Sequence, residues 1–74
     1  MSKILVIEDD LDISEVLKLY LENAQYEVYT AKTLLEGEKL LTEVSPDLIL
    51  LDVNLPDGNG FEFAQKIRKQ TDVE

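Results

Sequence analysis

Residues 48–60 have the sequence LILLDVNLPDGNG, an apolar tetrapeptide that ends in Asp52 and runs into a loop of turn-forming residues. We predict a strand over Asp47–Asp52, and its apolar composition favours burial on both faces, as in parallel sheets. Asp52 then lies at the carboxyl end of the strand, where open α/β sheets bind ligands. The stretch therefore predicts a parallel α/β fold with a functional carboxylate at Asp52.

A second apolar stretch, Ile4–Ile7, also ends in acidic residues, namely Glu8, Asp9 and Asp10. If the two strands lie side by side and parallel, at least three carboxylates converge at one edge of the sheet. Such like charges repel strongly unless a cation lies among them, so the pattern indicates a divalent-metal pocket with one carboxylate left to react. Asp10 and Asp12 are better explained as acidic residues that favour a helix N-terminus.

The segment between the first strand and residue 26 has helical periodicity. Its apolar residues recur at spacings of three and four and form one stripe: Ile13, Val16, Leu17, Tyr20, Leu21 and Ala24. Asp12 with Glu15 predicts a capping box at the helix start. The next segment, Tyr26–Ala31, alternates and contains β-formers, which indicates a short strand.

A second helix is predicted to begin with the capping box of Thr33 and Glu36 and to end before Ser45 and Pro46. Gly37 lies inside it at a cost of about 1 kcal/mol relative to Ala. Close packing of a neighbouring element is the expected reason for this glycine. After residue 60, apolar side chains again follow helical spacing, so the chain has the order βαβαβα. They include Phe61, Ala64 and Ile67, with Arg68 following.

The 74-residue chain makes at most one domain with a small core. It has 7 basic and 16 acidic residues, a net charge of −9, which argues against direct contact of this segment with nucleic acid or an anionic membrane. The chain has no cysteine, and no apolar run approaches the length of a membrane span. We expect a soluble, cytoplasmic module.

Three segments in this order, residues 3–10, 46–52 and 52–60, together resemble the N-terminal part of the receiver domain of two-component response regulators. The resemblance implies that residues 1–74 form the first three of five βα units. It also implies a partial flavodoxin-like, doubly wound parallel sheet of strand order 2-1-3 that lacks the last two βα units.

The same resemblance implies that Asp52 is the phosphoacceptor and also a residue of the metal site, with Mg²⁺ bridging it and the phosphoryl group. It further implies that Asp9 is a direct Mg²⁺ ligand, Glu8 a ligand through water and the backbone carbonyl of Asn54 a further ligand. We expect one of the loop glycines at residues 58 and 60 to have a positive φ. The implied partner is a sensor histidine kinase. Because the chain's own aspartate takes the phosphoryl group, we expect no turnover of an external substrate and do not classify the chain as an enzyme.

The family also uses a Ser or Thr after its fourth strand and a Lys after its fifth, so this segment alone is not expected to complete the switch. A DNA-binding domain often follows such domains, which makes transcription regulation an implication of kinship. Two alternatives are a fragment of a haloacid-dehalogenase-like phosphohydrolase, in which Asn54 would replace a second Asp, and a half-domain that mainly self-associates. An exposed third-strand edge would favour a homodimer or a domain-swapped assembly.

Overall fold

The computed structural model describes residues 2–52 and 54–70 of the chain, with the side chains of residues 54 and 68–70 outside that description, including that of Arg68. Its elements are β1 (Lys3–Ile7), α1 (Leu11–Asn23), β2 (Glu27–Ala31), α2 (Leu34–Val44), β3 (Leu48–Leu51), β4 (Asn54–Leu55), β5 (Gly58–Asn59) and α3 (Gly60–Gln70). Within the described residues, none of the helices combines the length and apolar character needed to cross a membrane.

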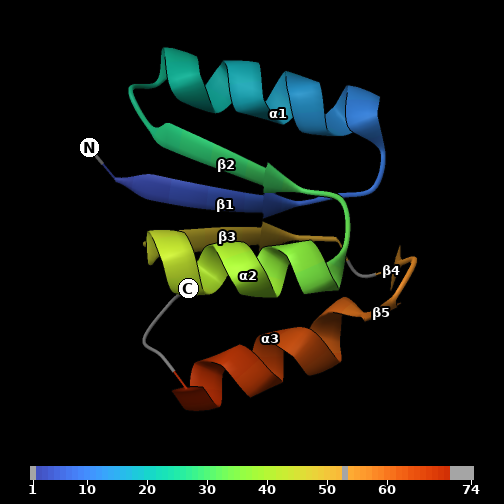
Figure 1. Ribbon diagram of the computed structural model, residues 1–74. Coiled ribbons are helices and arrows are strands. Elements are labelled where there is room, and N and C mark those ends of the chain that lie inside the picture. The colour runs from blue at the N-terminus through green and yellow to red at the C-terminus, as the bar shows by residue number, and fades with distance from the viewer. Residues whose placement is uncertain (1, 53, 71–74) are drawn as a thin grey trace.

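The central sheet has three parallel strands in the order β2-β1-β3 (Figure 1). In this register, Ile7 at the end of β1 pairs with Ala31 of β2 on one side and with Leu51 of β3 on the other. The three strands therefore end at one edge of the sheet. The predicted order 2-1-3 and the partial flavodoxin-like fold are confirmed.

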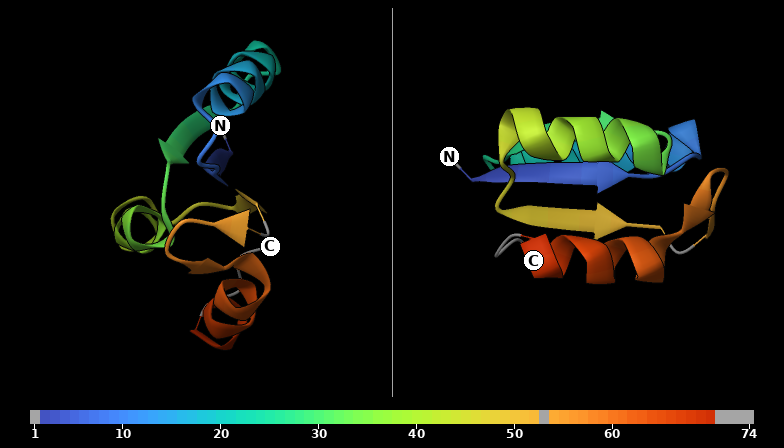
Figure 2. Two further views of the ribbon diagram at one scale, coloured as in Figure 1. Left: turned by 90° about the vertical axis from the view of Figure 1, so that its right-hand side faces the viewer. Right: turned by 60° about the horizontal axis from the view of Figure 1, so that its bottom comes forward.

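Helices cover both faces of this sheet: α1 lies on one side, and α2 and α3 lie on the other (Figure 2). The central strand β1 is the best-buried element, with Ile4 to Ile7 all buried. The main core lies on the side of α2 and α3, where six buried side chains cluster. They are Leu5, Ile7, Ala31, Leu55, Phe63 and Ile67.

Strand β3 differs from the prediction, because all four of its residues, Leu48–Leu51, are only half-buried. The expected burial on both faces is therefore wrong for the described part of the chain. Among the described residues β3 pairs with β1 alone, so it is an edge strand. An apolar composition predicts a parallel strand but does not show whether neighbours cover it.

The N-cap of helix α1 is Asp10 and not Asp12, so the helix begins two residues earlier than the predicted capping box implies. The Asp10 Oδ1 accepts hydrogen bonds from the backbone N–H groups of Asp12 (2.9 Å) and Ile13 (3.2 Å). Much of the predicted apolar stripe is exposed, with Val16 at 65% and Tyr20 at 71%. No second helix lies beside α1 on its side of the sheet in the described residues, so this stripe remains partly uncovered.

Helix α2 follows the prediction closely. The Thr33 side chain caps its N-terminus by accepting a hydrogen bond from the Glu36 N–H (3.1 Å), and the helix ends at Val44 before Ser45. Gly37 is buried against β1: a Cβ there would lie 3.0 Å from Ile7 Cγ1 and closer still to the Cδ1 atom of the same side chain. Close packing is therefore the reason for the glycine inside the helix.

The loop after Asp52 contains a short hairpin, β4–β5, that the sequence patterns did not predict. The two strands are antiparallel and flank a turn at residues 56 and 57. Neither Gly58 nor Gly60 has a positive φ, so that prediction is wrong. The described residues with positive φ are Gln25, two residues after the end of α1, and Ser45, which directly follows α2.

Candidate functional site

Backbone hydrogen bonds continue past the carboxyl ends of the strands and join β3 to β1 and β1 to β2. The N–H of Asp52 donates to the carbonyl of Ile7 (3.0 Å), and the N–H of Glu8 donates to the carbonyl of Ala31 (2.9 Å). These bonds fix the first residue after β1 and the first residue after β3 at neighbouring positions. The acidic side chains that follow the two strands are therefore held by the sheet itself.

Three carboxylates meet at this edge. One oxygen from each of Glu8, Asp9 and Asp52 lies within 4.8 Å of the others. Asp9 is exposed, and Glu8 and Asp52 are half-buried, so a solvated ion or small molecule can approach the cluster from outside. The structure thus brings together the three carboxylates whose convergence the sequence predicts, while the role of each remains a prediction.

The electrostatics of this acidic cluster are unfavourable for negative charge. Partial burial raises the pKa of the Glu8 carboxyl, and the neighbouring side chains of Asp9 and Asp52 raise this pKa further. The Asp10 N–H, which donates to Glu8 Oε2 (3.2 Å), acts in the opposite direction. The net effect is a raised pKa, so the surroundings of Glu8 stabilise its ionised form less well than water does.

Other predicted residues lie near the cluster without joining it. The Asp10 carboxylate points into the start of α1 and serves as its cap, in agreement with the helix-terminus interpretation. Asn54 begins β4, two residues after Asp52. Its side chain is outside the described side chains, and its carbonyl as a metal ligand remains a prediction.

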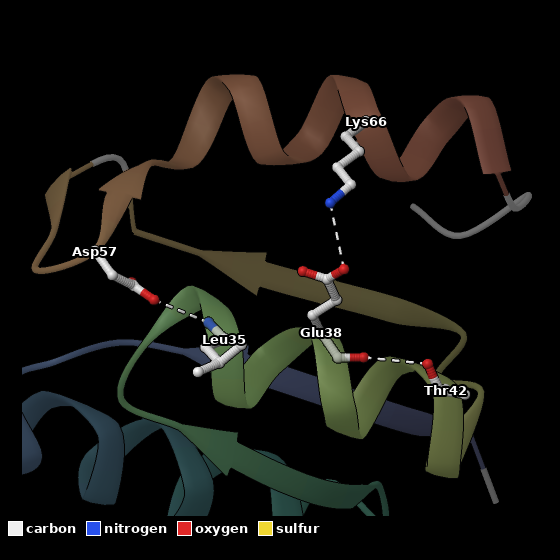
Figure 3. Close-up of polar contacts among 5 residues, drawn as sticks. All are labelled: Leu35, Glu38, Thr42, Asp57 and Lys66. Carbon is white, nitrogen blue, oxygen red and sulfur yellow. Dashed lines mark hydrogen bonds and ion pairs between the residues drawn. The ribbon is translucent and has the colours of Figure 1, made fainter.

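Asp57 has a role that the sequence patterns did not reveal. It lies in the turn of the hairpin, as expected of a turn residue, but its carboxylate also accepts the backbone N–H groups of Leu34 (2.8 Å) and Leu35 (3.0 Å). Figure 3 shows the Asp57 side chain directed at the first turn of α2. The partners are 22 and 23 residues away in the chain, so no local pattern could have indicated them.

These two hydrogen bonds lower the pKa of the Asp57 carboxyl, with the Leu34 N–H making the largest contribution and partial burial opposing it. A hydrogen bond from the backbone to the charged form favours that form, and a helix N-terminus favours negative charge in the same way. The surroundings of Asp57 therefore stabilise its anion, in contrast to those of Glu8.

The acidic cluster has the donor chemistry of a site for a hard divalent cation. Carboxylate oxygens are the preferred protein ligands of Mg²⁺ and Ca²⁺, and Mg²⁺ in particular keeps several waters while it binds one or two carboxylates. A cluster that is open to solvent on the Asp9 side leaves room for those waters. A carboxylate oxygen that remains uncoordinated beside the cation is available as a nucleophile.

Comparisons with known proteins identify sequences and folds to which this chain is similar. The sequence model of the response regulator receiver domain matches residues 4–74. The DNA-binding dual master transcriptional regulator RpaA of Synechocystis is 41% identical over 69 residues, which cover 93% of this chain and 29% of RpaA. The receiver domain of HemR from Leptospira biflexa has a TM-score of 0.90 and 44% identity, covering 97% of this chain and 58% of that one.

The response regulator TrrA of Thermotoga maritima is also similar, with 38% identity in two solved structures. Its complex with Mg²⁺-BeF has a TM-score of 0.91 over 97% of this chain and 63% of TrrA. Its complex with the histidine kinase ThkA has a TM-score of 0.90 over 97% and 62%. The chain thus spans less than a third of the length of RpaA and about three fifths of the solved chains.

Proposed function

The chain belongs to the response regulator receiver domain family, and from this we propose that residues 1–74 form the N-terminal part of a receiver domain whose phosphoacceptor is Asp52. The observation that carries the proposal is the approach of one oxygen each from Glu8, Asp9 and Asp52 to within 4.8 Å of one another. Among the three carboxylates of the cluster, that of Asp52 directly follows β3 and begins the segment that resembles the family's loop.

We propose Mg²⁺ as the cofactor, held by Asp9 and Asp52 directly, by Glu8 through water and by the backbone carbonyl of Asn54. The donor set supports this choice, because it consists of oxygens alone. The similarity to TrrA, which has been solved with Mg²⁺-BeF, supports it as well. When bound, Mg²⁺ would offset the negative charge that the carboxylates and a phosphoryl group bring together.

The proposed reaction takes place on the chain itself. A carboxylate oxygen of Asp52 attacks the phosphorus of a phosphohistidine, so that an O–P bond forms and the N–P bond breaks. The electron pair of the broken bond stays on the imidazole nitrogen, and Asp52 becomes an acyl phosphate. The Asp52 N–H bond to Ile7 (3.0 Å) holds the residue in place at the end of the sheet during this step.

A sensor histidine kinase is the proposed phosphoryl donor. TrrA, which is 38% identical to this chain, has been solved in complex with the histidine kinase ThkA, which supports this choice of partner. The chain modifies its own side chain and releases no product of an external substrate. We therefore place it among signal-transducing phosphoproteins and not among enzymes.

The phosphohydrolase alternative has no support from the family match. It also has a chemical difficulty, because an amide at Asn54 cannot act as a general acid or base. The alternative of a homodimer or domain-swapped assembly stays a prediction.

We propose that the phosphorylated domain regulates transcription through a part of the protein outside this segment. RpaA is named as a DNA-binding transcriptional regulator, and this chain covers 29% of it. The net charge of −9 disfavours direct DNA contact by the segment itself. A regulator that acts on bacterial DNA works in the cytoplasm, which is the location we propose.

The proposal is tested by incubating the full-length protein with acetyl phosphate and Mg²⁺ and measuring its intact mass. We expect the mass to increase by one phosphoryl group, and we expect Asp52→Asn to show no increase. Asp47→Asn is a matched control, because Asp47 precedes the other end of the same strand and bonds the Lys3 N–H (2.8 Å). Equal modification of Asp52→Asn and the wild type would refute the assignment of Asp52.

A further inference from the structure

The hairpin that follows Asp52 is attached to the rest of the molecule at three points. Leu55 of β4 is buried in the main core. Asp57, in the turn, accepts two N–H groups from the start of α2. Asn59 of β5 accepts the Phe61 N–H (2.7 Å) and, more weakly, a second N–H one residue further at the start of α3 (3.4 Å). One short hairpin therefore caps two helices.

The contact with α2 is close as well as polar. A Cβ atom on Gly58 would lie 2.7 Å from Leu34 Cδ1, so the hairpin backbone rests directly on the first residue of the helix. The Asp57 carboxylate satisfies the N–H groups of Leu34 and Leu35, and Thr33 satisfies that of Glu36. The unpaired donors of the first turn of α2 are thus divided between a residue of its own segment and a residue of the hairpin.

Helix α2 also contacts β1, the strand that leads into Glu8 and Asp9 of the acidic cluster. Its Gly37 packs against Ile7, the residue that directly precedes Glu8. Ile7 in turn accepts the Asp52 N–H through its carbonyl. A series of contacts therefore connects Asp52 to β1, β1 to α2, and α2 through Asp57 to the hairpin.

We propose that Asp57 is a positioning residue of the phosphoacceptor site: by binding the start of α2, its carboxylate holds the hairpin, and with it the backbone of Asn54, in the position that binds the metal ion. This inference rests on the proposed function, because Asn54, whose backbone carbonyl is a predicted metal ligand, begins the hairpin. Only four residues separate Asp52 from Asp57, so the loop has little length over which a shift of the hairpin could be absorbed.

The charge state of Asp57 supports the proposal. The two backbone hydrogen bonds lower the pKa of its carboxyl, so the cap is fully ionised at neutral pH. Glu38, Glu62 and Lys66 line the same surface pocket as Asp57. Lys66 pairs with Glu38 (3.3 Å) and so links α3 to α2 about one turn beyond the cap, as Figure 3 shows.

The experiment compares the Mg²⁺ affinity of three variants of the full-length protein by calorimetric titration. Asp57→Ala is expected to weaken Mg²⁺ binding by on the order of tenfold, the size of effect seen when groups that orient metal ligands are removed. Thr33→Ala removes the other cap of the same helix turn, does not touch the hairpin, and is expected to change the affinity less than about twofold. Glu62→Gln removes a nearby charge without removing a cap and is also expected to have an effect below about twofold.

The rate of modification by acetyl phosphate at subsaturating Mg²⁺ should follow the same order among the variants. Should Asp57→Ala fail to fold, Asp57→Asn takes its place, because the amide keeps one of the two acceptors and is expected to give a smaller loss in the same direction. Equal Mg²⁺ affinities for the Asp57 and Thr33 variants, with a wild type that binds Mg²⁺ and is phosphorylated, would overturn the positioning role alone. A wild type that does neither would overturn the proposed function and this inference together.

Discussion

Two sets of carboxylates lie at the same end of the molecule and have opposite surroundings. In the acidic cluster of Glu8, Asp9 and Asp52, one oxygen from each side chain lies within 4.8 Å of the others, and the pKa of Glu8 is raised. In the hairpin turn, Asp57 accepts two backbone N–H groups from α2, and its pKa is lowered. The same functional group is thus destabilised as an anion in one place and stabilised in the other.

This difference indicates that the acidic cluster is suited to bind a cation, whereas Asp57 is suited to a structural role. A carboxylate that already accepts hydrogen bonds from a helix N-terminus is stabilised as an anion, so a nearby cation adds little further stabilisation. Carboxylates that face one another repel, so a divalent cation between them stabilises their ionised forms strongly. A position near the carboxyl ends of the strands therefore does not by itself make an acidic residue a metal ligand. The hydrogen-bond partners of the carboxylate determine whether it is suited to bind a cation.

Substitution of Asp9 is the strongest test of this comparison. We expect Asp9→Ala to weaken Mg²⁺ binding by more than the roughly 10- to 100-fold that changes in outer-shell groups cause, because it removes a direct ligand. Calorimetric titration of the full-length protein measures this loss. An unchanged affinity would remove Asp9 from the site and with it the contrast between the two sets.

Removal of one carboxylate charge in the absence of metal should sharpen the comparison, because we expect it to change the stability of the protein in opposite directions at the two places. In EDTA, Asp52→Asn should stabilise the protein by about 1 kcal/mol, the size of the interaction between unit charges about 4 Å apart in water. Asp57→Asn should lower stability, because it removes the charge that two N–H groups favour. Thermal unfolding measures both, and a loss of stability in Asp52→Asn would contradict the repulsion inferred at the cluster.

The smallest expected effect is that of pH on the Asp57 cap. Its pKa is lower in the folded than in the unfolded chain, so its contribution to stability is fully present above the unfolded value and is lost as the pH falls through the folded value. We therefore expect wild type to be more stable than Asp57→Asn at pH 6, and we expect the difference to shrink as the pH falls below about 4, the ordinary value of an aspartate. Unfolding curves at several pH values test this, and a constant difference down to pH 2 would exclude the shift.

Much of the fold could be predicted because local patterns carry it. The apolar strands, the helical spacing between them and the break at Ser45-Pro46 depend on neighbours in the chain, and the observed order follows the predicted βαβαβα except for the added hairpin β4–β5. Thr33 was identified as a cap because its partner Glu36 is three residues away. The order 2-1-3 was implied by the family resemblance, and the sheet confirms it.

The errors have equally physical causes. Asp10 and Asp12 are both acidic residues at the start of one helix, and the choice of Asp10 depends on where the chain leaves β1. The apolar stripe of α1 was recognised, but its exposure depends on which elements lie beside it. One of the two glycines Gly58 and Gly60 is expected at positive φ, whereas the chain turns at Pro56 and Asp57 instead.

The sequence by itself determined that carboxylates would stand at the ends of two strands, because a strand's apolar run and the acidic residue that follows it are covalently adjacent. Only the tertiary structure decided that Asp57 would bind α2, because that contact joins residues 22 and 23 positions apart and requires the hairpin and the helix to be packed first. Covalent order fixes what is near in the chain, and the free energy of packing decides which distant groups become partners.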